Sequence, residues 1–366
     1  MKQLIITSFL LLASLNSNAQ NTVCFDVVAN PHASISGLNI FTKYIDVFGV
    51  KIFATQSVLD EDIKHCAAVM AEYLDNDEDG IIDNALVVDE MVASNASMVM
   101  FSVDGSADQT TFFNTYNGNW QLQDLYGSET HPTGSSQANG FDATLEEVLH
   151  LITHVGYAGA YPAVWGESIG TSLGNAMDIA RGGQFITIPG SYPAAAWYHY
   201  DDNTCDYSCM ATEYVYWSLT TLLGAQDYTG RCAEISNEWE MCTTSTFQAT
   251  DLTMNALLID PSYKFATSIP DGNYCPTQLN LSNLELYNQG VVLSPNPSNG
   301  IFNVLFNSAP EHLKIVVFNV QGRSLFRMED QNINNAVVTI SDAPSGTYFV
   351  EITTELGRDT LKYIKQ

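Results

Sequence analysis

The chain has 366 residues, of which 41 are Asp or Glu and 13 are Lys or Arg, giving a formal net charge of −28 at pH 7. Hydrophobic residues make up 46% of the chain and charged residues 15%, a composition that excludes a disordered acidic tail and a coiled coil. So few basic residues cannot form the cationic face that nucleic acid or an anionic membrane needs, so we expect no nucleic-acid partner. Cation binding stays open.

Residues 1–19 have the pattern of a secretory signal peptide. Lys2 precedes an apolar run from Leu4 to Leu15, and small and polar residues follow up to Ala19. The run is shorter than the roughly 20 residues that span a bilayer, and no other stretch is long and apolar enough. We therefore expect export, cleavage after Ala19 and no transmembrane segment.

Residues 20–280 are expected to form an acidic α+β body that is rich in helix in its second half. Alternating apolar residues predict a hairpin that turns near Gly49, and the apolar pattern predicts a helix and then a buried strand. Gly, Ser and Asn are frequent over residues 104–140, which we expect to be mainly loop. The expected elements are a hairpin over 44–54, a strand over 97–102, and helices over 63–74, 145–155, 167–180, 211–224, 233–241 and 249–259.

Residues 75–83 resemble an EF-hand-type calcium loop. The expected ligands are Asp75, Asp77, Asp79, the backbone carbonyl of Ile81, and Asp83. Gly80 stands at the position where such a loop turns sharply. Leu86 stands at position 12, where the family has a bidentate Glu, so Asp89 or Glu90 would have to close the shell. We expect an isolated structural calcium loop, and the alternative is a solvated acidic turn.

Two histidines stand four residues apart shortly after residues 104–140. On a helix, His150 and His154 share one face and can reach one metal ion. Glu167, or alternatively Asp178, would complete a site with two His and one carboxylate, which is typical of catalytic zinc. The stretch resembles the helix of zincin metallopeptidases, which reads His-Glu-x-x-His, but Leu151 stands where the general-base Glu belongs.

A general base would have to come from the preceding helical turn. Glu147 is the candidate catalytic residue, with Glu146 as its alternative, and the resulting activity would be metal-dependent hydrolysis, such as that of a peptidase. The structural alternative is that Thr144 and Glu147 form a capping box and that Gly156 ends the helix.

Two further sequence patterns are weaker evidence for a catalytic or binding function. Gly166–Gly170 matches Gly-x-Ser-x-Gly, but the preceding strand is too short for the nucleophile elbow of a serine hydrolase. Aromatic residues and carboxylates gather over 197–202 and 213–217, and they suit a core with a polar rim better than a sugar-binding surface.

The seven cysteines all lie in the acidic part, which suits an exported protein with disulfides. Because the number is odd, at least one stays free or pairs with another chain, and Cys66 lies in an apolar helical stretch that suits a buried thiol. Cys205 with Cys209 and Cys232 with Cys242 are candidate local pairs, although sequence alone does not determine connectivity. Half of a zinc site at Cys205 and Cys209 is the alternative, but no second half follows.

The composition changes at a polar linker over residues 281–290. Residues 291–366 contain six basic and seven acidic residues, whereas residues 20–290 contain six basic and 34 acidic residues. Short β-branched runs separated by turns predict a small all-β, immunoglobulin-like sandwich here. The expected strands cover residues 301–306, 314–320, 323–328, 336–340, 347–353 and 360–364.

This C-terminal part resembles the sorting domain of the type IX (Por) secretion system of Bacteroidetes. The resemblance is carried by Pro295–Gly300, Val317–Gly322, Ser345–Val350 and the basic end Lys362–Lys365, in the order of the family. It implies handling by the type IX secretion machinery and a secreted or cell-surface location. The body would then be a calcium-binding, metal-dependent hydrolase. The alternative is a non-catalytic, calcium-stabilised surface protein that binds an extracellular partner or polymer.

Overall fold

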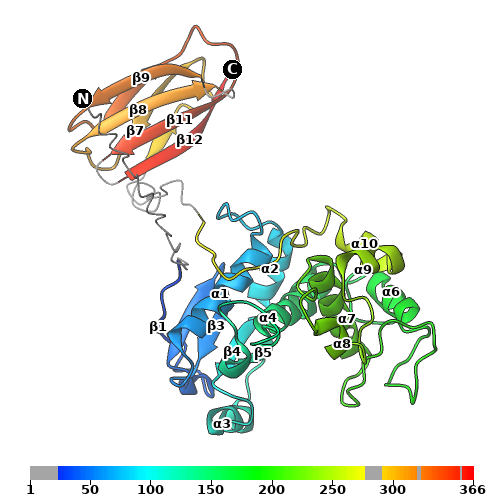
Figure 1. The fold of residues 1–366 in the computed structure, drawn as a ribbon. Coiled ribbons are helices and arrows are strands. Elements are labelled where there is room, and N and C mark those ends of the chain that lie inside the picture. Colours follow the sequence, from blue (N-terminus) through cyan, green and yellow to red (C-terminus); the bar gives the residue numbers. More distant parts are fainter. Residues whose placement is uncertain (1–23, 277–290, 320–322, 355–356) are drawn as a thin grey trace, which may run out of the picture. The chain divides into compact units, whose positions relative to one another are not determined.

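The structure is a computed structural model that describes residues 24–276, 291–319, 323–354 and 357–366. The chain divides into two compact units, residues 1–276 and 277–366, and each is described by itself (Figure 1). The expected signal peptide and linker lie outside the described residues.

A five-stranded mixed sheet forms the first half of the body, in the order β1-β2-β3-β4-β5. β1, β2 and β3 are antiparallel, whereas β3, β4 and β5 run parallel. The predicted hairpin is confirmed: Phe48 and Gly49 have φ of 53° and 91°, as a tight two-residue hairpin turn requires. The strands are β1 (Val28–Ala29), β2 (Lys43–Val47), β3 (Val50–Ala54), β4 (Ser97–Phe101) and β5 (Leu122–Tyr126).

Both faces of the sheet are covered, which explains why β4 is buried along its whole length. Met98 and Met100 face the main core under α1 and α4, whereas Val99 and Phe101 join an aromatic cluster with Phe112 of α3. The helices are α1 (Asp60–Leu74), α2 (Ala85–Ala93), α3 (Ala107–Thr115), α4 (Thr144–Leu151), α5 (Ala158–Ala160), α6 (Ser172–Ala180), α7 (Tyr207–Leu222), α8 (Arg231–Glu234), α9 (Thr244–Thr250) and α10 (Leu252–Leu258). Shorter turns are η1 (Leu38–Ile40), η2 (Gly127–Glu129) and the π-helix η3 (Ile152–Tyr157).

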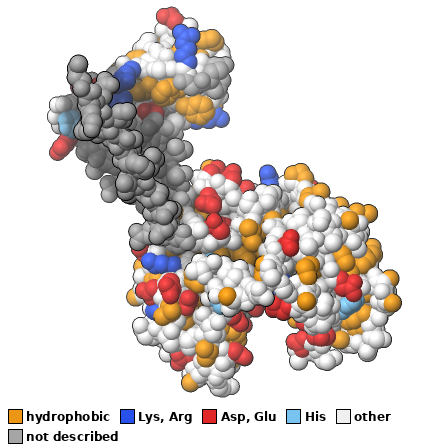
Figure 2. Space-filling view, viewed as in Figure 1, with side chains coloured by type: hydrophobic (Ala, Val, Ile, Leu, Met, Phe, Trp, Pro, Cys, Tyr) orange, Lys and Arg blue, Asp and Glu red, His pale blue; other side chains and the backbone are white. Residues whose placement is uncertain are grey.

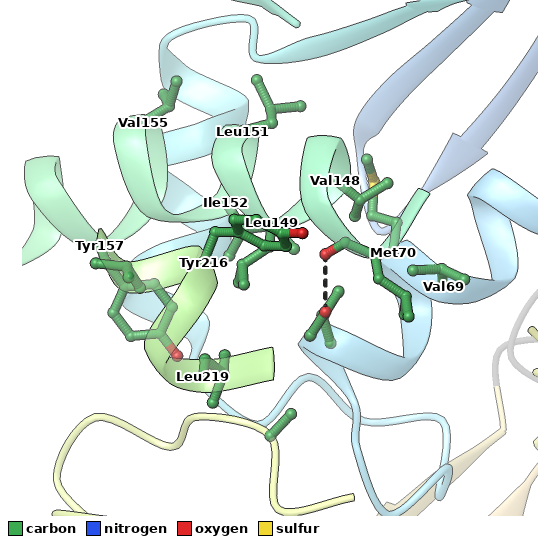
Figure 3. Close-up of a cluster of buried hydrophobic side chains, with 14 of the residues drawn as sticks. Val69, Met70, Val148, Leu149, Leu151, Ile152, Val155, Tyr157, Tyr216 and Leu219 are labelled. Carbon is green, nitrogen blue, oxygen red and sulfur yellow. Dashed lines mark hydrogen bonds between the residues drawn. The ribbon is translucent and has the colours of Figure 1, made fainter. Parts of the chain in front are cut away.

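Helix α4 lies at the centre of the body, where α1, α7 and the sheet strands β4 and β5 all contact it. Figure 3 shows Val69 and Met70 of α1 against Val148 of α4, with Tyr216 and Leu219 of α7 in the same cluster. All five side chains are buried, and each buried aliphatic side chain of this size stabilises the fold by about 1.5–3 kcal/mol. The core therefore holds α4 rigidly between the sheet and the C-terminal helices.

Several expected boundaries are wrong. Residues 104–140 are mainly loop, as expected, but they also contain α3 and β5, which were not expected. Their patterns are faint: α3 buries only Phe112, and β5, at the edge of the sheet, fully buries only Leu125. The helix expected over 233–241 is shortened to α8, and the one expected over 249–259 is divided at Asp251, which accepts from the backbone N–H of Met254 and begins α10.

The cysteine predictions are confirmed. Disulfides join Cys205 to Cys209 and Cys232 to Cys242, and a third joins Cys24 to Cys275 at the two ends of the body. Cys66 is a buried free thiol whose pKa is raised by burial, so it is unreactive. With Cys205 and Cys209 oxidised, the alternative of a half zinc site is wrong.

The C-terminal unit is all-β, as expected. A three-stranded sheet in the order β10-β7-β6 and a four-stranded sheet in the order β12-β11-β8-β9 share one core, in which Val304 and Val338 meet Ile315 and Val350. The immunoglobulin-like topology stays a prediction. The strands are β6 (Val292–Ser294), β7 (Ile301–Leu305), β8 (Leu313–Asn319), β9 (Ser324–Asp330), β10 (Asn335–Thr339), β11 (Gly346–Thr354) and β12 (Gly357–Lys365).

Among the described residues, no helix combines the length and the apolar character that crossing a membrane requires.

Candidate metal centres

Helix α4 does not end where the sequence indicated. It continues as the π-helix η3 and then as α5, so the prediction that Gly156 ends the helix is wrong. A Cβ atom at Gly156 would lie 2.6 Å from Val87 Cγ1 and 3.0 Å from Met91 Cγ, both on α2. Glycine is therefore needed for close packing. Single π-turns within α-helices are frequent at functional sites.

The imidazole of His150 is buried, with only 6% of the residue exposed. Its Nδ1 lies 3.3 Å from Glu147 Oε2, and its Nε2 lies 3.5 Å from Glu213 Oε2 on α7. Within the described part of the chain, Nε2 is a buried atom with no hydrogen-bond partner. Such an atom requires an explanation, and a bound ion or water is the common one.

Carboxylates surround this imidazole. One ligand atom each of Glu146, Glu147 and His150 lies within 4.8 Å of the others. Glu147 Oε2 also accepts a hydrogen bond of 2.6 Å from Gln123 Nε2 on β5, while its Oε1 takes no part in these contacts. Three elements, α4, α7 and β5, thus contribute to one centre.

The charges at this centre are strongly coupled. Burial raises the pKa of Glu146 to about 8, and the neighbouring carboxylates of Glu213 and Glu147 add to the rise. Burial alone would lower the pKa of His150, but Glu213 and Glu147 hold it well above its ordinary value. The centre therefore favours a positive charge at or beside the imidazole.

The predicted capping box of Thr144 and Glu147 does not form. Helix α4 begins after Ala143 without a side-chain cap, and Thr144 Oγ1 is buried without a hydrogen-bond partner in the described structure. The carboxylate of Glu147 faces Gln123 and His150 instead of the helix N-terminus.

His154 and Glu167 form a separate pair, with His154 Nδ1 2.6 Å from Glu167 Oε2. Glu167 Oε2 also accepts from Ser208 Oγ at 2.7 Å, and its Oε1 accepts from Thr212 Oγ1 at 2.6 Å. The side chain of His154 is 53% exposed. Of the described residues, His150 does not join His154 and Glu167 in one group of donor atoms within 4.8 Å.

Asp178, the alternative to Glu167, forms an ion pair of 2.9 Å with Arg181 and accepts from Gln184. Glu213, which lies beside His150, was not anticipated by sequence reasoning. The sequence does contain a sign of its role. Glu213 is the one charged residue of α7, and the other residues of this helix are apolar or uncharged.

The surface of the body is hollowed near this centre. Figure 2 shows a notch between the part that carries α3 and β5 and the part that carries α7 and α8, with acidic side chains on both sides. Helix α4 runs between these two parts (Figure 1). The side chains of Glu147 and Glu213 remain 23% and 15% exposed, so both reach the surface of the body in part.

The loop that follows α1 brings three acidic side chains together. One carboxylate oxygen each of Asp75, Asp77 and Asp79 lies within 4.8 Å of the others. Gly80 turns with φ of 84°, and its N–H donates to Asp75 Oδ2. Asp83 Oδ2 accepts from the N–H of Asn76, which holds the end of the loop against its start.

Other atoms of the loop do not face this group. The hydrocarbon side chain of Ile81 points to solvent and is 70% exposed. The atom of this residue that could bind a cation is its backbone carbonyl oxygen. Leu86 is 59% exposed on α2, and the N–H of Ile81 donates to Asp79 Oδ1. A calcium ion here would be bound by the carboxylates of the loop, a backbone carbonyl and water.

The loop is bound to the last segment of the body. Tyr274 donates to Asp75 Oδ2, Asn76 accepts from the N–H groups of Thr267 and Ser268, and Glu72 accepts from the N–H groups of Asp271 and Gly272. The disulfide at Cys275 is next in the chain. The loop therefore positions the C-terminal end of the body.

The two weaker patterns prove structural. Gly166–Gly170 lies between α5 and α6 with no strand before it, and Thr171 caps α6. Trp197 and Tyr214 both donate to the buried carboxylate of Asp251, so this aromatic region belongs to the core.

A comparison with protein families adds the identity of the C-terminal unit. Residues 293–366 match the model of the secretion system C-terminal sorting domain. A comparison with curated proteins found no match. Three disulfides in the body fit an oxidising destination. The C-terminal unit is thus a sorting domain of this secretion-system family, and the protein is exported by the type IX machinery to the cell surface or the extracellular space.

Proposed function

We propose that the body of this exported protein is a metal-dependent hydrolase whose centre lies around His150. One observation carries the proposal: a buried imidazole has Nδ1 beside the carboxylate of Glu147, while Nε2 faces Glu213 without a hydrogen bond. Imidazole nitrogen and carboxylate oxygen are the donors of catalytic zinc sites, which keep one position open for water.

The chemistry follows from the groups around the imidazole. A zinc ion in such a site lowers the pKa of its bound water to about 7 and so supplies a nucleophile at neutral pH. Glu147 is the candidate general base, because its Oε1 is not used by Gln123 or His150. A carboxylate within hydrogen-bond reach of the water would take its proton.

The calcium loop has a structural role in this proposal. Asp75, Asp77 and Asp79 would bind calcium with the carbonyl of Ile81 and with Asp83. The loop also contacts the segment that ends at Cys275, so calcium would stabilise the C-terminal end of the body.

The first experiment measures hydrolysis by the secreted full-length protein. We expect the zinc-loaded protein to cleave members of a fluorogenic peptide library, and 1,10-phenanthroline to abolish the cleavage. Glu147→Gln should lower kcat by about 100-fold or more with its zinc content unchanged, because it removes the base. Asp178→Asn, whose carboxylate pairs with Arg181 away from the centre, is the control and should keep kcat.

Two results would contradict the proposal. One is a zinc-loaded protein that cleaves nothing in the library, and the other is full activity in Glu147→Gln. Calcium uptake without any zinc would favour the non-catalytic, calcium-stabilised surface protein instead.

A further inference from the structure

We infer that the metal of this centre is bound by Glu146, His150 and Glu213, and that His154 and Glu167 are not ligands. The inference rests on the proposed function and specifies its site. This ligand set contains one histidine and two carboxylates, which come from α4 and α7. The sequence alone had suggested two histidines from one helix.

His150 Nε2 and Glu213 Oε2 lie 3.5 Å apart. Two ligand atoms bound at 2.0–2.1 Å to one tetrahedral zinc ion lie about 3.3–3.4 Å apart. The two atoms thus have the spacing of atoms that share a metal, and this spacing is longer than that of an ordinary hydrogen bond.

The other ring nitrogen of His150 faces a carboxylate that the protein holds in place. His150 Nδ1 faces Glu147 Oε2 at 3.3 Å, and Gln123 Nε2 holds that same oxygen at 2.6 Å. Metal-binding histidines commonly donate their second ring N–H to a carboxylate, which fixes the tautomer and leaves the other nitrogen for the metal. Nε2 is therefore the atom prepared for a metal ion.

Glu146 supplies the third ligand. It precedes His150 by four residues on α4, so the two side chains share one helix face, and one of its carboxylate oxygens lies within 4.8 Å of donor atoms of His150 and Glu147. Glu213 is not part of that group and meets His150 through Nε2 instead. Tyr216, which is also on α7, packs edge-on to the His150 ring, with the ring centroids 5.6 Å apart.

The sequence Glu146-Glu147-Val148-Leu149-His150 has the ligand–base–x–x–ligand spacing of His-Glu-x-x-His, with glutamate in place of the first histidine. The resemblance to the zincin helix thus applies one helical turn earlier than the two histidines suggested. Leu151 no longer interrupts the motif, because it lies after the last ligand.

His154 and Glu167 need no metal ion. Both oxygens of Glu167 accept hydrogen bonds, from His154 and Ser208 at Oε2 and from Thr212 at Oε1. His154 is largely exposed and uses Nδ1 in this pair. Both carboxylate oxygens of Glu167 thus accept short hydrogen bonds from the protein, whereas His150 Nε2 makes only the 3.5 Å contact with Glu213 Oε2.

The experiment is a titration of the chelator-treated, full-length secreted protein with Zn²⁺, followed by calorimetry. We expect one zinc ion per chain in the wild type. Glu213→Gln and Glu146→Gln should each weaken zinc binding by at least tenfold, and His150→Ala should abolish it. His154→Ala is the matched control on the same helix and should bind zinc within twofold of the wild type.

Zinc K-edge absorption spectroscopy on the wild type keeps the test independent of whether a variant folds. We expect one imidazole and oxygen ligands around zinc. Two imidazoles, or loss of zinc in His154→Ala with normal binding in Glu213→Gln, would overturn the inference while leaving the hydrolase proposal standing. One imidazole with no hydrolysis would support the ligand set and reject the hydrolase, and absence of zinc would reject both.

Discussion

His150 shows how much of the candidate site a sequence can reveal. Its nearest carboxylates, Glu146 and Glu147, lie one helical turn away, so the spacing along the chain was enough to indicate them. Glu213 comes from α7, and only the packing of α7 on α4 brings it to Nε2. Two histidines at helical spacing favoured His154, which the structure places in a separate exposed pair with Glu167.

Glu72 is a second residue whose properties depend on the fold. It lies near the end of α1, where one carboxylate oxygen accepts from Asp271 and Gly272 and the other, Oε1, is buried without a hydrogen-bond partner in the described chain. Burial raises its pKa from 4.5 to about 7, and Asp271 and Glu78 add to the rise. The residues near it in the sequence give no sign of this.

The raised pKa of Glu72 predicts a pH dependence of stability. Because its folded-state pKa of about 7 exceeds the unfolded value of 4.5, the folded state binds more protons between these pH values. The free energy of unfolding therefore falls as pH rises from 4.5 to 7. Glu72→Gln should flatten this part of the curve, as measured by urea unfolding at several pH values without calcium.

Glu61→Gln, an exposed glutamate on the same helix, is the control and should keep the wild-type slope. An unchanged slope in Glu72→Gln would show that the carboxylate titrates normally in the folded protein.

The elements with strong local patterns were predictable. The hairpin of β2 and β3, helix α1 and strand β4 follow from alternation, helical spacing and a continuous apolar run. Strand β5 was missed because an edge strand buries little, although it is the strand that delivers Gln123 to the centre. The extension of α4 through η3 was missed because Gly156 is a helix-ending residue whose role here is tight packing on α2.

The loop after α1 predicts a calcium effect on stability. At a calcium concentration about 100 times Kd, binding to the folded state adds about 2.7 kcal/mol, which corresponds to a rise in Tm of about 5–10 °C for a unit of this size. Asp77→Ala should remove most of this rise, because it deletes a ligand whose side chain is exposed and whose loss costs little packing.

Glu61→Ala removes an equal charge from an exposed position in the first turn of α1, at the opposite end of that helix from the loop, and is the control in these Tm measurements. It should keep the full calcium effect. Equal Tm values for the wild type with calcium and with EGTA would show that the loop is only a solvated acidic turn.

At the scale of the whole molecule, two units with different surfaces are joined in one chain. Residues 20–290 contain 34 acidic and six basic residues, whereas residues 291–366 are nearly balanced. The sorting domain could be predicted from ordered local motifs, and the family match confirms it. The chemistry of the body was harder to predict, because it depends on contacts between α4, α7 and β5.

Deleting residues 291–366 should stop export while leaving the body folded, because each unit has its own hydrophobic core. Immunoblots of culture medium, cell surface and periplasm would locate the truncated protein, which we expect to remain in the periplasm. The signal of the full-length protein in the same strain is the control. Truncated protein in the medium at the full-length level would contradict this role of the sorting domain.

The location of a bound zinc ion tests the central claim most directly. Crystals of the zinc-loaded protein, measured at the zinc absorption edge, should give one anomalous peak at the centre on α4. We expect the peak about 2.0–2.1 Å from His150 Nε2 and from carboxylate oxygens of Glu146 and Glu213. A peak between His154 and Glu167, or no peak in the body, would contradict the account.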